Sequence, residues 1–200
     1  MAHMPSSSMT GTHKNDNDGT NEKEEWRSQQ LFFQKPNSMM GYRVNQLVNA
    51  CPPLDTNSVY CNIIQCDHFA DTSVAVTQKD ELVGFISGHI KPSQTTTLFI
   101  WQVAVSEKAR GQNLGVRMMR EILARPSCTK VNYLETTVTP ENYASTAMFK
   151  KLCEELHAGE LAINQSYTRD THFNGEHETE KLFRIGPFLQ PKSIETKKVD

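Results

Sequence analysis

The sequence predicts an α/β fold with one central mixed sheet flanked by helices. Helical periodicity alternates with short strand-like runs, a pattern typical of that class. The strongest strand-like runs, rich in apolar and β-branched residues, lie at 82–90, 96–105 and 131–138. A length of 200 residues suits one domain, and no repeat or linker divides its middle. We therefore expect a single domain over residues 27–189.

The two ends differ in composition from that domain. Residues 1–26 are rich in Ser, Thr, Asn, Asp and Lys and contain almost no apolar side chains. Such a segment cannot bury enough apolar surface to fold, so we expect a disordered tail. Its first four residues resemble an expression-tag remnant. The similar segment 190–200 is expected to be a flexible tail.

The domain begins with a strand and two helices. The run 31–35 predicts a strand that Pro36 closes. Ser38 suits the N-cap of a helix, and Pro52 ends it. A second helix follows a cluster of capping residues and carries its apolar residues along one face. The candidate caps are Asp55, Asn57 and Ser58.

Strands and helices then alternate to the end of the domain. A third helix at 113–124 has an apolar stripe that includes Leu114 and Met118. A fourth helix is expected to start with Thr139 as its cap and Pro140 in its first turn, and to run to about Leu156. The expected strands are 73–77, 82–90, 96–105, 131–138, 161–165 and 182–185.

Composition excludes several classes of partner. A formal net charge of −2 gives no reason to expect nucleic acid or an anionic membrane, and no apolar run is long enough to span a bilayer. The five cysteines are odd in number and contain no C-x-x-C pair, which favours reduced thiols and a cytoplasmic location. The spacing of Cys61, Cys66 and His68 matches no standard zinc pattern, so no metal is expected.

One segment has the pattern of an anion site. The apolar run 99–105 leads into a polar turn with Arg110, Gly111, Asn113 and Gly115, and a helix follows at once. The first N–H groups of a helix lack intrahelical partners and attract phosphate. Neither the P-loop nor the dinucleotide glycine pattern is present. An ordinary strand–turn–helix connection is the alternative.

The turn resembles the acetyl-CoA signature of the GNAT N-acetyltransferases, with Asn113 in place of the first glycine. Asparagine tolerates a left-handed backbone, so the turn can survive. Asn142-x-x-Ser145 with Phe149 resembles the second cofactor motif of that family. The resemblance implies acetyl-CoA as co-substrate and no prosthetic group. The cofactor contacts that it implies are Val103, Ala104, Val105, Arg110, Gly111, Gln112, Asn113, Leu114, Gly115, Val116, Asn142, Ser145 and Phe149.

Further segments narrow the resemblance. Pro52-Pro-Leu-Asp-Thr-Asn-Ser58 and Gly175-Glu-His-Glu-Thr-Glu180 are not general GNAT features. Together with the strand around Trp101 they resemble the diaminobutyrate N-acetyltransferases of ectoine biosynthesis, over about residues 31–188. This resemblance implies transfer of acetyl to the 4-amino group of L-2,4-diaminobutyrate, and a homodimer. It implies that the substrate is lined by Asp55, Tyr60, Trp101, Thr137, His177 and Glu180.

The chemistry of that substrate suggests roles for these residues. Two ammonium groups need anionic partners, for which Asp55 and Glu180 are candidates. His177 is a candidate donor to the substrate carboxylate or to a water. Glu180 is the first candidate for the general base, followed by Asp55. Phe149 stands where many family members have a tyrosine acid, so the thiolate must leave unprotonated or take its proton from water or another residue.

Purely structural roles for the same residues remain open. Asp55 could be only a helix cap, Trp101 only a core residue, and 176–180 only a solvated acidic loop. Two other functions also remain. One is a GNAT enzyme for another diamine or diamino acid. The other is an acyl-CoA-binding module without catalysis.

Overall fold

A computed structural model of the chain describes Trp26 and residues 28–189. The expected tails at 1–26 and 190–200 lie outside the described residues, except for Trp26. That residue packs against the core, and its carbonyl accepts a 2.9 Å hydrogen bond from Nε2 of the buried Gln78. The strands are β1 (Phe32–Gln34), β2 (Val74–Gln78), β3 (Glu81–Lys91), β4 (Gln94–Val105), β5 (Tyr133–Val138), β6 (Leu161–Thr168) and β7 (Glu180–Ile185).

These strands form one sheet in the order β1-β2-β3-β4-β5-β7-β6. Neighbouring strands are antiparallel, except for the parallel pair β4–β5. The expected mixed sheet is thereby confirmed. The helices are α2 (Gly41–Asn49), α3 (Val59–Asp67), α4 (Leu114–Leu123) and α5 (Tyr143–Glu155).

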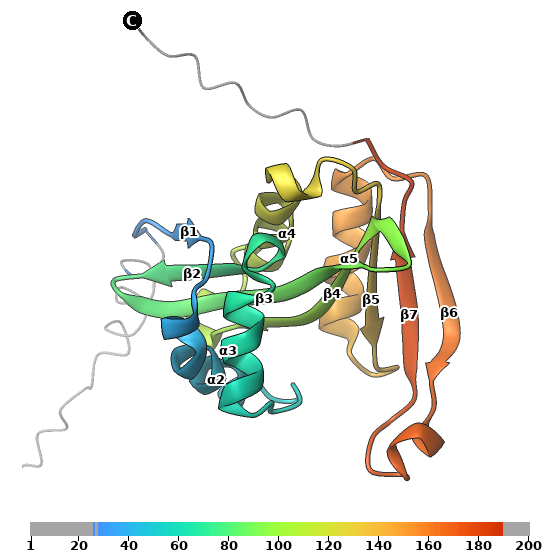
Figure 1. Ribbon diagram of the computed structural model, residues 1–200, viewed down its shortest axis with the longest axis horizontal. Helices are drawn as coiled ribbons and strands as arrows, with labels where there is room; N and C mark the ends of the chain where they lie inside the picture. Colours follow the sequence, from blue (N-terminus) through green and yellow to red (C-terminus); the bar gives the residue numbers. More distant parts are fainter. Residues whose placement is uncertain (1–25, 27, 190–200) are drawn as a thin grey trace, which may run out of the picture.

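Helices cover both faces of the sheet (Figure 1). The face with α2 buries one apolar cluster that includes Val44, Phe85 and Ala104. The face with α4 and α5 buries a larger cluster that includes Met118 and Leu152. Within the described residues, no helix has the length and apolar character needed to cross a membrane.

The sheet splits between β4 and β5. The two strands pair only from Thr97 to Ile100 on β4, and β4 continues to Val105 with no partner strand on that side among the described residues. The register of β3 against β4 shifts at the same place, where Ser87 faces Gln102 and Gly88 faces Ile100, so Trp101 is an extra residue. A bulge re-aims side chains and ends pairing, and here it opens the edge of β4.

Two expected helix starts are corrected, and a third is narrowed to one of its candidate caps. Asn37, not Ser38, caps the first helical turn, and α2 begins at Gly41. Of the three candidate caps for α3, Ser58 is the N-cap, and its hydroxyl accepts from the Cys61 N–H at 3.1 Å. Helix α5 begins after Asn142, not at Thr139. In each case a side chain that bonds the first turn decides the start.

Candidate active site

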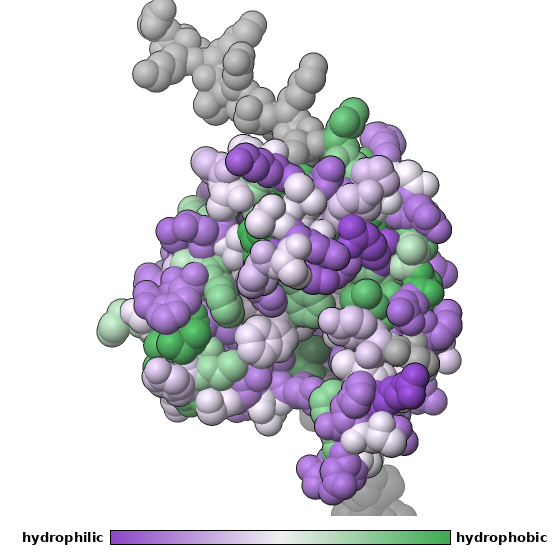
Figure 2. Space-filling model, turned by 45° about the vertical axis from the view of Figure 1, so that its right-hand side comes forward, coloured by the Kyte–Doolittle hydropathy of each residue, from purple (hydrophilic) through white to green (hydrophobic). Residues whose placement is uncertain are grey.

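A pocket of about 1080 Å³ opens at the split between β4 and β5. It lies under two segments: residues 53–57, which precede α3, and residues 173–180, which end in β7. In Figure 1 the second segment forms the tip of the long β6–β7 hairpin and projects beyond the sheet. Figure 2 shows this projection at the lower right of a mostly hydrophilic face, with a hollow above it. We call this cavity the acidic pocket.

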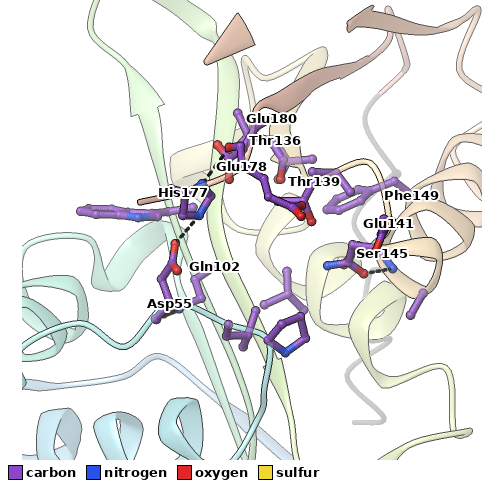
Figure 3. Close-up of a pocket in the computed structure, with 18 of the residues that line it drawn as sticks. Asp55, Gln102, Thr136, Thr139, Glu141, Ser145, Phe149, His177, Glu178 and Glu180 are labelled. Carbon is purple, nitrogen blue, oxygen red and sulfur yellow. Dashed lines mark hydrogen bonds and ion pairs between the residues drawn. The ribbon is translucent and has the colours of Figure 1, made fainter. Parts of the chain in front are cut away.

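The ionisable side chains that line the acidic pocket are mostly carboxylic acids. Among the described residues that line it there is no Lys or Arg, and the ionisable ones other than Tyr143 are two histidines and five carboxylic acids. Several of these groups converge in Figure 3. Such a lining favours a cationic ligand, because an ammonium loses its hydration here and needs anionic acceptors in return. The five acids are Asp55, Glu141, Glu176, Glu178 and Glu180.

Asp55 and His177 form an ion pair across the pocket, with Oδ2 and Nε2 2.9 Å apart (Figure 3). The other ring nitrogen, Nδ1, lies 2.8 Å from the carbonyl oxygen of Glu178. That carbonyl chiefly, and Asp55 in addition, raises the pKa of His177 against a smaller opposing effect of burial. Asp55 is therefore not a helix cap, because Ser58 caps α3 and the Asp55 carboxylate has an ionic partner 122 residues away.

Buried amides hold the segment that carries Asp55. Gln102, on β4, donates from Nε2 to the Asp55 carbonyl at 2.9 Å and accepts from Asn57 at 3.2 Å. Asn45, on α2, donates to the Asn57 carbonyl at 2.7 Å. Sequence reasoning missed Gln102 and Asn45, although a polar residue inside the apolar run 98–105 was a usable signal. These bonds fix the backbone of Asp55 relative to the central strand.

Glu180 lies at the first position of β7, opposite Thr168 on β6. Its N–H donates to Thr168 Oγ1 at 3.2 Å, and that hydroxyl lies 3.4 Å from Glu180 Oε2. Thr137 on β5 and the half-exposed Trp101 also line the pocket. Five of the six predicted substrate contacts thus line one pocket, although they come from separate parts of the chain. They are Asp55, Trp101, Thr137, His177 and Glu180.

A second, smaller cavity of about 580 Å³ lies beside the first and contains the predicted cofactor turn. We call it the turn pocket. Asn113 adopts φ 57° and Gly111 φ 80°, so the left-handed backbone expected of Asn113 is present. Arg110 and Lys151 line this pocket, and no described carboxylate does. Its sign of charge is therefore opposite to that of the acidic pocket.

The free edge of β4 connects the two pockets. Ser106 donates to the carbonyl of Val83 on β3 at 2.9 Å. Along an antiparallel pair, the backbone groups of successive residues point alternately toward the partner strand and away from it. Since those of Ser106 point toward β3, the N–H and C=O groups of Val103 and Val105 point away from β3 and into the split. One of them is already engaged, since the Cys51 thiol lies 3.3 Å from the Val105 carbonyl. The other three have no identified partner in the part of the chain that the structure describes, and an extended, amide-containing ligand could pair with them.

Asn142 and Phe149 shape the junction between the pockets. Asn142 lines both cavities, and its Oδ1 accepts from the Ser145 N–H at 3.0 Å. Phe149 is 2% exposed and meets Phe183 edge to face at 6.4 Å. Its ring has no proton to donate, as its identity already indicated.

Three predicted contacts are not brought to either cavity. Tyr60 is 72% exposed on α3 and does not line the acidic pocket. The side chain of Ala104 is buried on the α2 face, because it alternates with Val103 and Val105. Gln112 does not line the turn pocket. Sequence reasoning also missed His89, Glu141 and Phe173, which do line the acidic pocket.

Three of the five cysteines, Cys51, Cys66 and Cys128, are buried, and Cys61 and Cys153 are partly buried. Burial raises the pKa of all five, that of Cys66 to about 12. None lines the acidic pocket. A thiol with a raised pKa is a poor nucleophile at neutral pH.

The split sheet and the left-handed turn before α4 point to an acetyl-CoA-dependent N-acetyltransferase of the GNAT class. Residues 42–154 match the model of the acetyltransferase (GNAT) family. The chain is also 48% identical to the L-2,4-diaminobutyric acid acetyltransferase of Methylotuvimicrobium alcaliphilum, over 79% of this chain and 91% of that protein. The corresponding enzyme of Vibrio parahaemolyticus is 43% identical, over 79% and 87%. The chain thus belongs to the diaminobutyrate acetyltransferase family within the GNAT class.

A solved structure agrees with this assignment. Diaminobutyrate acetyltransferase EctA from Paenibacillus lautus, in complex with L-2,4-diaminobutyric acid and coenzyme A, superposes with a TM-score of 0.77. It is 34% identical, and the match covers 82% of this chain and 99% of that one. A ribosomal-protein-S18-alanine N-acetyltransferase from Escherichia coli, at 15% identity and a TM-score of 0.55, shares the fold.

Proposed function

We propose that the protein transfers the acetyl group of acetyl-CoA to the 4-amino nitrogen of L-2,4-diaminobutyrate, as a step of ectoine biosynthesis under osmotic stress. The observation that carries this proposal is the acidic pocket: five carboxylic acids and no described Lys or Arg, joined to a turn pocket of the opposite charge. A diamine fits the first cavity and a polyphosphate the second. The named relatives and the coenzyme A complex support the same pair of substrates.

The proposed donor site follows the free edge of β4. The pyrophosphate binds the helix N-terminus at Asn113–Leu114, beside Arg110, where N–H groups and the helix dipole favour anions. The pantetheine arm, which contains amides, pairs with the open groups of Val103 and Val105. This places the thioester near Asn142, at the junction of the two pockets.

The reaction is proposed as direct transfer in a ternary complex. The neutral 4-amino nitrogen attacks the thioester carbon, a C–N bond forms, and the C–S bond breaks as coenzyme A leaves. An amine with a pKa of about 10 is only about one part in a thousand neutral at pH 7. A base must therefore accept its proton. The N–H of Val103, aimed into the split, is the candidate donor to the oxyanion.

Glu180 is the proposed base, acting directly or through water. The competing candidate, Asp55, is ion-paired with His177 at 2.9 Å and is better suited to hold an ammonium than to accept a proton. The thiolate is proposed to leave without an acid at Phe149. A thiol pKa near 8.5 makes such departure tolerable at neutral pH.

The direct test is an assay of the purified protein with acetyl-CoA and L-2,4-diaminobutyrate, with NMR of the product to locate the acetyl group. We expect N4-acetyl-L-2,4-diaminobutyrate and free coenzyme A in equal amounts. Ornithine and lysine, tested alongside, distinguish another diamino acid as substrate. Binding of coenzyme A without turnover of any of these would favour the non-catalytic module.

The assembly and location are also proposals. We propose a homodimer in the cytoplasm, supported by the resemblance to the family and by the odd number of cysteines without a C-x-x-C pair. Light scattering behind size exclusion tests the first part. A mass near 22.7 kDa, that of one chain, would contradict the dimer. Localisation of the tagged protein in its own cell tests the second.

A further inference from the structure

The sulfur of coenzyme A needs a hydrogen-bond donor when the C–S bond breaks. Negative charge then develops on sulfur, at a pocket whose described lining holds five carboxylic acids and no Lys or Arg. An anion that loses its hydration without gaining a partner is costly. Both histidines of the lining are engaged elsewhere, since His89 lies between two phenylalanine rings and His177 bonds two oxygen atoms. Phe149 has no proton to offer, so a neutral O–H or N–H group is the remaining kind of donor from the protein.

Thr136 lies at the point where the sheet splits. It is the last residue of β5 that pairs with β4, where it stands opposite Ile100. On its other side it is paired with Phe183 of β7. Paired residues of neighbouring strands place their side chains on the same face, and Phe183 meets the Phe149 ring edge to face at 6.4 Å. The Thr136 side chain therefore lies on the face of the sheet that carries Phe149, next to Phe183.

The hydroxyl of Thr136 is buried but poorly bonded. The residue is only 4% exposed, yet it lines the acidic pocket together with Phe149 (Figure 3). Its Oγ1 donates to the Thr137 carbonyl at 3.5 Å, whereas hydroxyls ordinarily bond oxygen at about 2.5–3.0 Å. Buried polar groups normally have a good partner, and a hydroxyl can turn about its C–O bond to find one. This hydroxyl can thus leave a weak contact for a ligand atom in the split.

Several other neutral donors line the pocket but are placed less well. Thr137 alternates with Thr136, so its side chain faces the opposite side of the sheet. Tyr143 is 75% exposed, and water competes for its hydroxyl. Asn142 and Ser145 line both cavities, along the proposed path of the pantetheine arm before the sulfur is reached. Ser145 is the strongest competitor, because it lies one helical turn from the residue where an acid is missing.

We propose that the Thr136 hydroxyl donates a hydrogen bond to the sulfur of coenzyme A as the acetyl group is transferred. When the tetrahedral intermediate collapses, the oxyanion re-forms the carbonyl and the electron pair of the C–S bond goes to sulfur. The Thr136 proton stays on its own oxygen, so coenzyme A leaves as a hydrogen-bonded thiolate and takes a proton from water after release. This inference rests on the proposed function and deepens it, since it names the residue that compensates for the acid missing at Phe149.

The kinetic test compares Thr136→Val, which keeps the shape and removes the hydroxyl, with Thr136→Ser, which keeps the hydroxyl. Thr97→Val, at a buried threonine of β4 outside both pockets, is the matched control. We expect the single-turnover rate of acetyl transfer to fall by about 10- to 100-fold in Thr136→Val, the range of a hydrogen bond to a charged group. Thr136→Ser and Thr97→Val should stay within about threefold of the wild type. An unchanged rate in Thr136→Val, or an equal loss in Thr136→Ser, would overturn the proposal. Thermal unfolding confirms that each variant is folded.

Binding provides a readout that does not depend on the acceptor. Coenzyme A and desulfo-coenzyme A, which lacks the sulfur, are titrated by calorimetry between about pH 6.5 and pH 9.5. A hydrogen bond to the thiolate lowers the pKa of the bound thiol below its ordinary value of about 8.5. Coenzyme A should therefore gain affinity relative to desulfo-coenzyme A, by about tenfold, as the pH rises toward that value.

The variants assign this gain to a residue. It should disappear in Thr136→Val and persist in Ser145→Ala, even where Ser145→Ala weakens the binding of both ligands. No gain in the wild type, the same gain in Thr136→Val, or a loss of the gain in Ser145→Ala alone would overturn the proposal. A wild type that shows the gain but acetylates no diamino acid would instead count against the proposed function.

Discussion

The acidic pocket and the turn pocket share the edge of β4, yet they are built in different ways. The turn pocket is made largely of backbone: two left-handed residues, a helix N-terminus and the open groups of a strand. The acidic pocket is made of side chains from segments as far apart as Asp55 and Glu180. Backbone features tolerate changes of residue type provided that the conformation survives, as the Asn113 turn demonstrates. A site made of side chains does not tolerate such changes, because the chemical groups themselves are lost.

The largest expected effect is on the side-chain site. Glu180→Gln removes a carboxylate at the pocket but keeps the shape, so kcat should fall by about 10²- to 10⁴-fold, the range of general base catalysis. The KM for acetyl-CoA should stay unchanged, since Glu180 does not line the turn pocket. Steady-state kinetics with both substrates measure this. Glu160→Gln, an exposed acid outside both pockets, is the control. A full kcat with only a higher KM for diaminobutyrate would rule out Glu180 as the base.

A buried amide is expected to have the next largest effect. Gln102→Leu leaves the Asp55 carbonyl and the Asn57 amide without their partner, at a cost of about 1–3 kcal/mol. Asp55 then loses its fixed position, and the KM for diaminobutyrate should rise by about tenfold. Gln46→Leu, on the exposed side of α2, should have no such effect. If Gln102→Leu changed the KM for acetyl-CoA equally, the two pockets would not be independent.

The turn should respond to backbone conformation, not to side-chain chemistry. Asn113→Val places a β-branched residue at φ 57°, which costs about 1–3 kcal/mol in strain. We expect an approximately tenfold rise in the KM for acetyl-CoA and little change in the KM for diaminobutyrate. Asn113→Gly, which removes the strain, should bind acetyl-CoA at least as well as the wild type. A loss in Asn113→Gly equal to that in Asn113→Val would assign the effect to the asparagine side chain instead.

The smallest effect is expected at Cys51. Its thiol meets the Val105 carbonyl at 3.3 Å, at the end of the open strand edge. Cys51→Ser keeps a donor there and Cys51→Ala does not, so the alanine variant should raise the KM for acetyl-CoA by about two- to fivefold relative to serine, the range of one neutral hydrogen bond. Titration of coenzyme A by calorimetry measures the difference. Identical values for the two variants would mean that this bond does not shape the donor site.

The comparison also explains what was predictable from sequence. The turn pocket lies within one continuous segment, so the strand, Asn113 and the helix start of α4 could be predicted from neighbouring residues. The mixed sheet could be predicted for the same reason, since each element has its own periodicity. Element ends were less accurate. The start of α5 depends on whether Thr139 or Asn142 bonds the first turn, and composition does not decide between them.

The acidic pocket was predictable only in part. The resemblance to the family brought Asp55, His177 and Glu180 together, but nothing in their spacing implies the ion pair between the first two. The amides of Gln102 and Asn45 could not be assigned either, because their partners are backbone groups in a distant loop. Tyr60 is near Asp55 in sequence, but it lies on an exposed face of α3 and does not line the pocket.

The single extra residue at Trp101 reverses the alternation of side chains between the two faces of β4. Ile100 and Val103 would face opposite sides of a regular strand, yet Ile100 belongs to the cluster under α4 and α5 and Val103 packs against it. Replacing Trp101 would alter one wall of the pocket. Deleting it would instead invert every later side chain of the strand, turning Ala104 toward α4 and burying Val103 under α2. The same deletion would exchange the backbone groups of Val103 and Val105 with those bonded to β3, so the length of β4 determines whether a donor site exists at all.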